Sequence, residues 1–232
     1  MLDLRPFASL GRFDNDWLKA RHHFSFSDYY DPARMGWGPL RVWNDDTIRP
    51  QSGFPPHGHA DMEIITYVRK GAISHGDNQG NRGRTAAGEV QVMSAGRGIR
   101  HSEMNLEDEE TQLFQIWIMP NARGLAPRWE ARPFPSAHDG DGLVPLASGR
   151  GAPGALAIAQ DATLFAGRLA AGASLTHDLA GGRLAYLVPT VGALRVGDVT
   201  VGTRDGLAIG DLDELALTAT EDAVFVLADL PR

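Results

Sequence analysis

The chain has 232 residues, of which 43% are hydrophobic and 22% are charged, and it contains no cysteine. This length can bury a sizeable core in one large domain or in two small ones. The absence of cysteine excludes disulfides, zinc–thiolate sites, iron–sulfur clusters and thiol nucleophiles. Because 22 basic residues face 29 acidic ones, the net charge is −7. An acidic chain of this kind is not expected to bind nucleic-acid phosphates directly.

No apolar stretch is long enough to cross a membrane as a helix. The longest, such as residues 223–228, fall far short of the roughly 20 residues that a span needs. Asp3 and Arg5 interrupt the region where a signal peptide would have an unbroken apolar segment. We therefore expect a cytoplasmic protein with no membrane partner, and we expect it to be a monomer.

Short alternating or β-branched segments recur along the chain and predict strands. Each is bounded by Gly, Pro, Asn or Asp, and the 27 glycines and 14 prolines supply many tight turns. Helical periodicity is weak, and only residues 14–20 favour one short helical turn, after Asp14 as a cap. The predicted fold class is all-β, a sandwich or barrel. The clearest strand segments are residues 63–68, 89–93, 113–119 and 223–227.

The composition changes near residue 140. Of 18 aromatic residues, 15 lie before residue 136, and residues 132–154 are rich in Pro, Gly, Asp and Ser. Both halves contain a strand that leads into a glycine turn, at Gly71 and at Gly192. This match fits a distant duplication, and shared turn chemistry alone would also produce it. We expect an N-terminal domain, a connecting segment and a C-terminal domain, over residues 1–135, 136–154 and 155–232.

Two short segments carry candidate metal ligands, His57 with His59 and His101 with Glu103. Residues two apart on a strand point to the same face, so each pair can present its side chains together. If the two strands are neighbours, three imidazoles and one carboxylate converge. That set suits a divalent first-row metal with open positions, unlike a closed structural zinc site. Either pair alone could lie on a solvated loop or strand, but their joint presence favours a site.

The residues around these ligands resemble the cupin superfamily. Longer stretches narrow the resemblance to the pirin family, at residues 22–32, 38–46, 53–63 and 94–105. The sequence resemblance is strong over residues 5–135, whereas the later half fits the family's second cupin domain only in its length and its pattern of strands and turns. Residues with the spacing of the first cupin motif are Gly53, His57, His59, Glu63 and Gly71, and those of the second are Gly88, Gly96, His101 and Asn105.

The resemblance implies a bicupin, in which two antiparallel β-barrel or jelly-roll domains pack together and the N-terminal one holds a single metal. The family's ligands carry over onto His57, His59, His101 and Glu103. Glu63 is a ligand position in many other cupins, and here we expect it to make a contact outside the ligand set. The family favours iron(II), although Mn, Co, Ni, Cu or Zn would also suit these donors.

The C-terminal domain is expected to be structural and without metal. His177 is its one histidine, so three imidazoles cannot be assembled there. Asp178 and Ala180 stand where the glycine alignment places the counterparts of His57 and His59.

The resemblance also implies a metal-dependent dioxygenase of the quercetinase type. Such an enzyme opens the heterocycle of a flavonol such as quercetin with O₂ and releases carbon monoxide, so a flavonol or another enolic compound and O₂ are the expected partners. Glu103 is then the expected catalytic base for the 3-hydroxyl proton. The alternative is a metal-containing regulatory protein, a transcription cofactor or redox sensor that acts through a protein partner. Turnover that disappears with the metal would distinguish the two.

The remaining polar residues are expected to have structural roles. His22 and His23 are adjacent and face opposite ways in an extended chain, so they cannot chelate together, and His23 is considered for the site opening. Residues 44–46 are expected to form a turn. His75 and Asp77 are expected on the surface of a hairpin.

Overall fold

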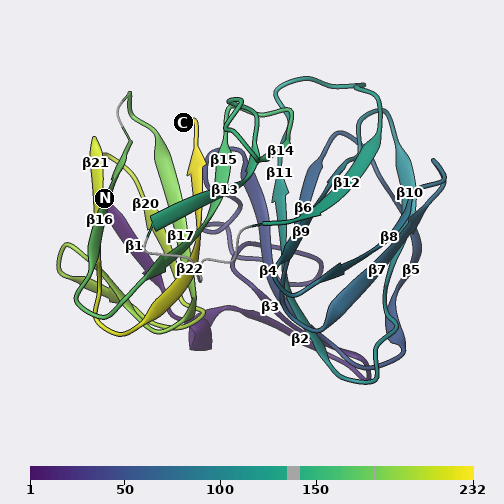
Figure 1. Cartoon of the computed structure of the whole chain (residues 1–232), viewed down its shortest axis with the longest axis horizontal. Coiled ribbons are helices and arrows are strands. Elements are labelled where there is room, and N and C mark those ends of the chain that lie inside the picture. The colour runs from purple at the N-terminus through teal and green to yellow at the C-terminus, as the bar shows by residue number, and fades with distance from the viewer. Residues whose placement is uncertain (135–141, 180) are drawn as a thin grey trace.

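The structure, a computed structural model, describes residues 1–134, 142–179 and 181–232. Its described residues are almost entirely β-structure, and the one helical segment among them is the 3-10 turn η1 (Phe7–Ser9). Within these ranges no helix is long and apolar enough to cross a membrane. The strands form two lobes side by side, which we call the N-terminal and C-terminal lobes (Figure 1).

Two sheets build the N-terminal lobe, at the right of Figure 1. All strand pairs within it are antiparallel. The larger sheet has seven strands in the order β12 (Arg128–Pro133), β9 (Glu89–Ser94), β6 (Glu63–Lys70), β11 (Thr111–Ile118), β4 (Leu40–Ile48), β3 (Leu18–His22) and β2 (Gly11–Asp14). The smaller sheet has four strands in the order β5 (Ser52–His59), β10 (Ile99–Asn105), β7 (Ala72–Asp77) and β8 (Arg82–Ala86).

The C-terminal lobe repeats this plan. The larger sheet has the order β1 (Leu2–Arg5), β20 (Gly206–Ile209), β17 (Leu184–Val191), β22 (Ala223–Leu230), β15 (Thr163–Leu169), β13 (Gly142–Ser148) and β14 (Leu156–Ala157). The smaller sheet has the order β16 (Ser174–Asp178), β21 (Glu214–Ala219), β18 (Leu194–Val196) and β19 (Val199–Val201). Pairing is antiparallel except between β13 and β14. The predicted all-β bicupin architecture is confirmed.

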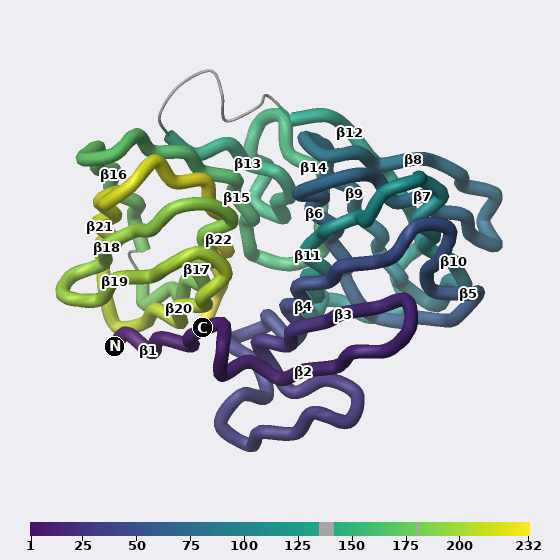
Figure 2. Tube along the Cα trace, turned by 90° about the horizontal axis from the view of Figure 1, so that it is seen from below, coloured from purple at the N-terminus to yellow at the C-terminus, as the bar shows by residue number. Residues whose placement is uncertain are grey.

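The chain crosses between the lobes at its first strand. β1 pairs with β20, with Leu2 opposite Ile209 and Arg5 opposite Gly206. Figure 2 shows this strand on the C-terminal lobe, after which the chain passes to β2 and β3 on the other lobe. Residues 142–148 of the expected connecting segment form β13, which pairs with β15. Residues 136–141 of that segment, and residues 135 and 180 beyond it, lie outside the described residues.

The helical turn predicted for residues 14–20 is wrong, because β2 and β3 form a hairpin there. The side chain of Asn15 decides the local geometry. Its Oδ1 accepts hydrogen bonds from the backbone N–H groups of Trp17, at 3.0 Å, and Leu18, at 2.7 Å. The backbone N–H of Asn15 also donates to the carbonyl oxygen of Leu18 at 2.9 Å, and together these bonds close the turn of the hairpin.

The large N-terminal sheet buries both faces, and alternate residues serve each face. Trp43, Ile65 and Phe114 face the C-terminal lobe and share one buried cluster with Tyr186 and Val226. This cluster lies between the two large sheets and joins the lobes into one body.

The interiors of the two barrels are filled differently. The C-terminal barrel is filled by one apolar cluster of buried residues, with Leu187, Leu217 and Phe225 among its members. Inside the N-terminal barrel there are two smaller apolar clusters, one around Ile48 and one around Met93. Polar side chains separate these two clusters and belong to the site described below.

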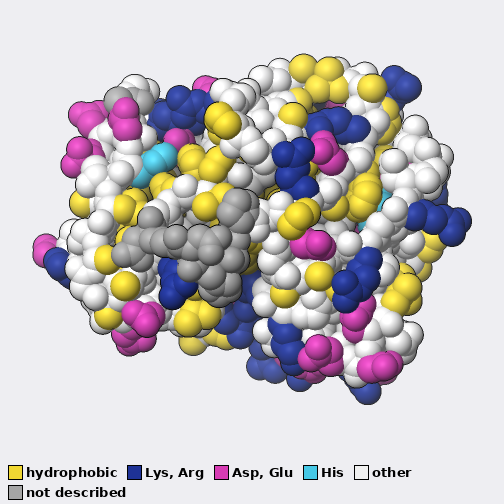
Figure 3. Space-filling model, in the orientation of Figure 1, with side chains coloured by type: hydrophobic (Ala, Val, Ile, Leu, Met, Phe, Trp, Pro, Cys, Tyr) yellow, Lys and Arg dark blue, Asp and Glu magenta, His cyan; other side chains and the backbone are white. Residues whose placement is uncertain are grey.

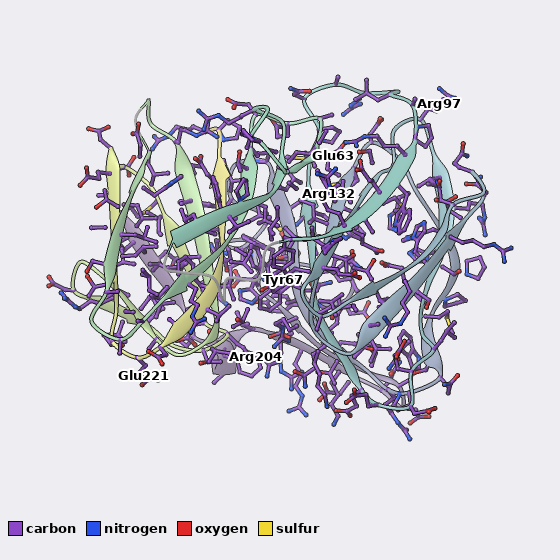
Figure 4. The ribbon with its side chains drawn as sticks, in the orientation of Figure 1. Glu63, Tyr67, Arg97, Arg132, Arg204 and Glu221 are labelled. Carbon is purple, nitrogen blue, oxygen red and sulfur yellow. The ribbon has the colours of Figure 1, made fainter. Side chains whose placement is uncertain are left out.

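Polar contacts also link the lobes. Asp45 of β4 is fully buried and pairs with Arg69 of the same lobe and, at 2.5 Å, with Arg204 of the other lobe. Figure 4 shows Arg204 at the boundary between the lobes. His23 is fully buried there with its Nδ1 2.9 Å from the hydroxyl of Tyr186, so it does not lie at a site opening.

We predict that Asp45→Asn lowers the free energy of unfolding by about 3 kcal/mol, because it leaves two arginines beside a neutral group in a buried setting. Urea unfolding would measure the change. The control is Asp211→Asn, which breaks an exposed pair with Arg232 and should cost much less, because exposed ion pairs contribute little to stability. Equal losses in the two variants would contradict a buried interlobe pair.

Candidate metal centre

The four predicted ligands lie on two neighbouring strands. β5 carries His57 and His59, and β10 carries His101 and Glu103. The strands pair antiparallel with His101 opposite His57, and the register shifts between His101 and Glu103. The ring centroid of His57 lies 4.8 Å from that of His59 and 4.5 Å from that of His101, and the last two are 5.1 Å apart. The expected adjacency of the two motifs is therefore observed.

The imidazoles of His57 and His101 direct their Nε2 atoms toward each other, at 3.1 Å. The carbonyl oxygen of Pro55 lies 2.8 Å from Nδ1 of His57. A carbonyl can only accept, so Nδ1 of His57 carries the proton and Nε2 presents a lone pair. The backbone of β5 thus orients one candidate ligand.

His101 is oriented by a second pair, His75 and Asp77. Nε2 of His75 donates to Asp77 Oδ2 at 2.9 Å, so Nδ1 of His75 is an acceptor. This Nδ1 of His75 lies 3.4 Å from Nδ1 of His101. Nδ1 of His101 therefore donates the hydrogen bond, and Nε2 of His101 has a lone pair. Burial raises the pKa of Asp77, but hydrogen bonds from His75 and Asn81 lower it on balance, which keeps the carboxylate ionised.

The surface position expected for His75 and Asp77 is wrong, since both side chains are 0% exposed. The ring of Trp129 stacks on His75 with centroids 4.9 Å apart and planes 10° from parallel. This tryptophan comes from β12, far along the chain, so local turn chemistry could not indicate that it covers the hairpin.

The donor set fits a divalent metal. Two Nε2 lone pairs 3.1 Å apart repel unless a cation lies between them. Burial, and then the neighbouring imidazoles, lower the pKa of His101 to about 3, while burial and His57 lower that of His59 to about 4. Both rings are therefore neutral at pH 7, which is the form that binds metal. The ligand nitrogens of all three histidines lie within 4.8 Å of one another.

Glu103 is buried at the inner end of this cluster. Its Oε1 accepts a hydrogen bond from Nε2 of Gln91 at 2.7 Å, and its Oε2 accepts one from Nε2 of Gln115 at 2.8 Å. Burial raises its pKa to about 7 despite these donors. Glu103 forms a second group with His75 and His101, whose ligand atoms also lie within 4.8 Å of one another. Each carboxylate oxygen has two lone pairs, so the amides leave capacity for another partner.

A row of polar side chains crosses the inner face of the large sheet. Its members lie opposite one another on five adjacent strands, and the row separates the two apolar clusters. His22 bonds Asn44 at 2.7 Å between Nδ1 and Oδ1. The turn expected at residues 44–46 is wrong, because they lie within β4. In order, the row is His22, Asn44, Gln115, Thr66 and Gln91.

Sequence reasoning missed this row, although a signal was present. Thr66 and Gln115 are isolated polar residues inside segments that were already predicted as strands. A polar residue in an otherwise apolar strand needs a buried partner, and here both contact Glu103.

Glu63 lies apart from the candidate ligands. Its Oε2 accepts a hydrogen bond from the hydroxyl of Ser94 at 2.6 Å, and both residues are buried. Figure 4 shows Glu63 near the boundary between the lobes. As expected, it makes a contact outside the histidine cluster.

The cluster opens into a cavity of about 310 Å³, at the small end of the range for ligand pockets. Aromatic side chains form much of its wall, and polar groups from the row line its inner surface. Basic and acidic side chains are intermixed on the described surface that Figure 3 shows. The cavity is lined by Phe13, Trp17, Phe26, Phe54, Trp117, His22, Asn44, Asp46, Gln115 and the four candidate ligands, among others.

The raised pKa of Glu103 predicts a pH effect on metal-free protein. Its folded pKa of about 7 lies above its ordinary value of 4.5, so the folded state keeps a proton that the unfolded state has lost. The contribution of Glu103 to stability, up to about 3 kcal/mol, should therefore be lost as pH rises from 4.5 to 7, while the lowered pKa values of His59 and His101 act in the opposite direction in the wild type and the variant alike. Glu103→Gln lacks this loss, so its stability relative to the wild type should rise from about pH 5 to pH 8. Urea unfolding with a chelator would measure this, and a difference that does not change with pH would contradict it.

The chain matches known proteins along most of its length. The family model Pirin matches residues 4–118, and the model for the quercetinase C-terminal cupin domain matches residues 145–230. The pirin-like protein of Caulobacter vibrioides is 55% identical over 230 residues, 99% of each chain. The quercetin 2,3-dioxygenase of Escherichia coli K12 is 42% identical and spans 100% of this chain and 99% of its own.

Solved structures agree with these sequence matches. The crystal structure of the bacterial pirin YhhW from Escherichia coli in complex with nickel(II) is 40% identical. It covers 100% of this chain and 99% of its own, with a TM-score of 0.95. The chain therefore belongs to the pirin family.

Proposed function

We propose that this protein is a metal-dependent dioxygenase that opens the heterocycle of flavonols such as quercetin with O₂ and releases carbon monoxide. One observation supports this above all: the imidazoles of His57, His59 and His101 lie together at an aromatic-lined cavity that the buried carboxyl of Glu103 also lines. A relative that is 42% identical over the whole chain is named quercetin 2,3-dioxygenase, which agrees with this chemistry.

We propose His57, His59, His101 and Glu103 as the ligands of one divalent ion, iron(II) in the first instance. The carbonyl of Pro55 and the His75–Asp77 pair hold two of the rings with their Nε2 atoms toward the site. Such supporting hydrogen bonds fix the tautomer and orientation of ligating histidines. The nickel(II) in the solved relative is consistent with a donor set that accepts several first-row ions.

In this proposal the residues of the cavity bind the substrate and move its proton. When bound, the ion would act as a Lewis acid on the flavonol's 3-hydroxyl and 4-carbonyl oxygens and supply the redox chemistry for O₂. Glu103 would accept the 3-hydroxyl proton as general base. Gln91 and Gln115 hold its two oxygens. The aromatic walls would keep a planar substrate in place and exclude water.

The first prediction of this proposal concerns metal content. Wild-type protein purified without oxygen should hold one divalent ion per chain, and the double variant His57→Ala/His101→Ala should lose most of it. Elemental analysis of both samples would measure this. His177→Ala, in the C-terminal lobe, is the control and should keep the wild-type content. Full metal content in the double variant would contradict the ligand assignment.

The second prediction separates catalysis from binding. Metal-loaded Glu103→Gln should lose turnover of quercetin by roughly 10²–10⁴-fold, because an amide cannot accept the proton. Its quercetin affinity should change much less. Oxygen uptake would report turnover, the spectral shift of quercetin would report binding, and metal content would be measured in the same sample.

The matched control is Glu63→Gln, which changes a buried carboxyl that bonds Ser94 away from the cluster and should retain turnover. Wild-type turnover in metal-replete Glu103→Gln would show that Glu103 is not the base. If metal-loaded wild type turned over no flavonol or other enolic compound, the regulatory alternative would be preferred.

A further inference from the structure

The cavity contains a second buried carboxyl group, Asp46, which has no task in the proposed reaction. It lies on β4, lines the cavity and is 2% exposed. Its Oδ1 is buried and has no hydrogen-bond partner among the described residues. The preceding residue, Asp45, faces the other side of the sheet and pairs with Arg69 and Arg204. Two adjacent carboxyl groups are thus buried on opposite faces, one fully partnered and one not.

Strand register places Asp46 within reach of a ligand held at the histidine cluster. On β4, Asn44 lies opposite Gln115, and Asp46 lies two residues further along the same face. Diagonal neighbours of this kind are about 7–8 Å apart, and Gln115 donates to Glu103 at 2.8 Å. The distance from the Glu103 side of the cavity to Asp46 is therefore on the scale of one or two aromatic rings.

Stability does not account for a carboxyl group at this position. Its cross-strand neighbours Ala20 and Leu113 belong to an apolar cluster with Ile48, which an aliphatic side chain would extend. A buried polar group without a partner is destabilising. Groups of this kind cluster at ligand sites, where function is retained at the expense of stability.

The protonation state of Asp46 suits a hydroxyl partner. Burial, followed by the nearby carboxyl groups of Asp45 and Glu103, raises its pKa well above the ordinary value. The neutral acid is favoured, and it offers one O–H donor and one carbonyl acceptor. A phenolic hydroxyl also donates one hydrogen bond and accepts another, so the two groups are complementary.

We propose that Asp46, with Asn44 and His22 beside it, forms a subsite for a phenolic hydroxyl of a planar aromatic ligand whose chelating oxygens face the histidine cluster. The orientation of that ligand rests on the proposed function. The aromatic residues Phe13 and Trp17 line the same cavity and supply faces against which a planar ring can pack. The ligand class is therefore a polyphenol with a hydroxyl group remote from its chelating pair.

Three flavonols test this subsite by equilibrium binding to metal-loaded protein. All share the chelating 3-hydroxyl and 4-carbonyl: 3-hydroxyflavone has no other hydroxyl, galangin adds hydroxyls on the fused ring, and quercetin adds further ones on the pendant ring. Asp46→Leu should lower the affinity for quercetin, galangin or both by roughly tenfold, which corresponds to the loss of one good hydrogen bond. The affinity for 3-hydroxyflavone should change less than about twofold. Asp46→Asn keeps a hydrogen-bond donor and an acceptor. It should therefore retain most of the wild-type discrimination, meaning the difference in affinity among the three flavonols.

Thermal unfolding of metal-free protein distinguishes the subsite from a structural role of Asp46. If Asp46 stabilised the fold, replacing it would lower the midpoint of unfolding, whereas the subsite predicts no such decrease. Asp46→Leu should keep or raise the midpoint of unfolding, because it removes an unpaired buried polar group. The matched control is Asp45→Asn on the opposite face of the same strand. It should lower the midpoint and leave the discrimination among the three flavonols unchanged.

Several outcomes would overturn the subsite. They are an equal effect of Asp46→Leu on all three flavonols, no effect on any of them, a lower midpoint like that of Asp45→Asn, or failure of all three to bind the wild type. Failure of the proposed function is read separately, from oxygen uptake by the wild type. Selective weakening without turnover in any sample would support the subsite and reject the dioxygenase.

Discussion

The large N-terminal sheet has two buried faces, and the alternation of residues along its strands decides which side chains serve each face. Trp43, Phe114 and Asp45 face the C-terminal lobe, whereas Asn44 and Asp46 face the cavity. A slip of one residue in β4 would exchange the two sets, placing a tryptophan in the cavity and an unpaired carboxyl between the lobes. Packing of the lobes and construction of the site are therefore one constraint, and the interlobe contacts hold the register on which the site depends.

The two barrels differ in how their interiors are packed, and the difference reflects this constraint. The C-terminal barrel fills its interior with aliphatic residues and Phe225, a filling typical of close-packed protein cores. The N-terminal barrel divides its apolar residues into two clusters and buries imidazoles, amides and carboxyls between them. Most of these polar groups are paired, as the contacts of Glu103 with Gln91 and Gln115 illustrate. The second lobe supplies the apolar surface that makes such an interior tolerable.

Local periodicity was enough to find the candidate ligands, because His-x-His and His-x-Glu pairs on strands need only the two-residue repeat to share a face. It was not enough for the residues that support them. Local sequence predicts a surface position for His75, because nothing near it in sequence indicates that Trp129 covers it. Local sequence predicts a turn at residues 44–46 because Asn and Asp favour turns, although long-range pairing places them in a central strand. Tertiary context overrode local preference in both cases.

The crossing of β1 has a consequence for how the molecule can assemble. Leu2 through Arg5 are synthesised some two hundred residues before their partner β20 (Gly206–Ile209). Closing so long a loop carries a large entropic penalty, and such distant pairing slows folding. Until β20 is synthesised, β1 has no partner strand. Until β1 then docks, β20 is the edge strand of its sheet, and an open edge of this kind promotes misassembly. A strand synthesised early thus completes a sheet whose other strands follow much later, so the C-terminal lobe cannot form its full sheet as an independent unit.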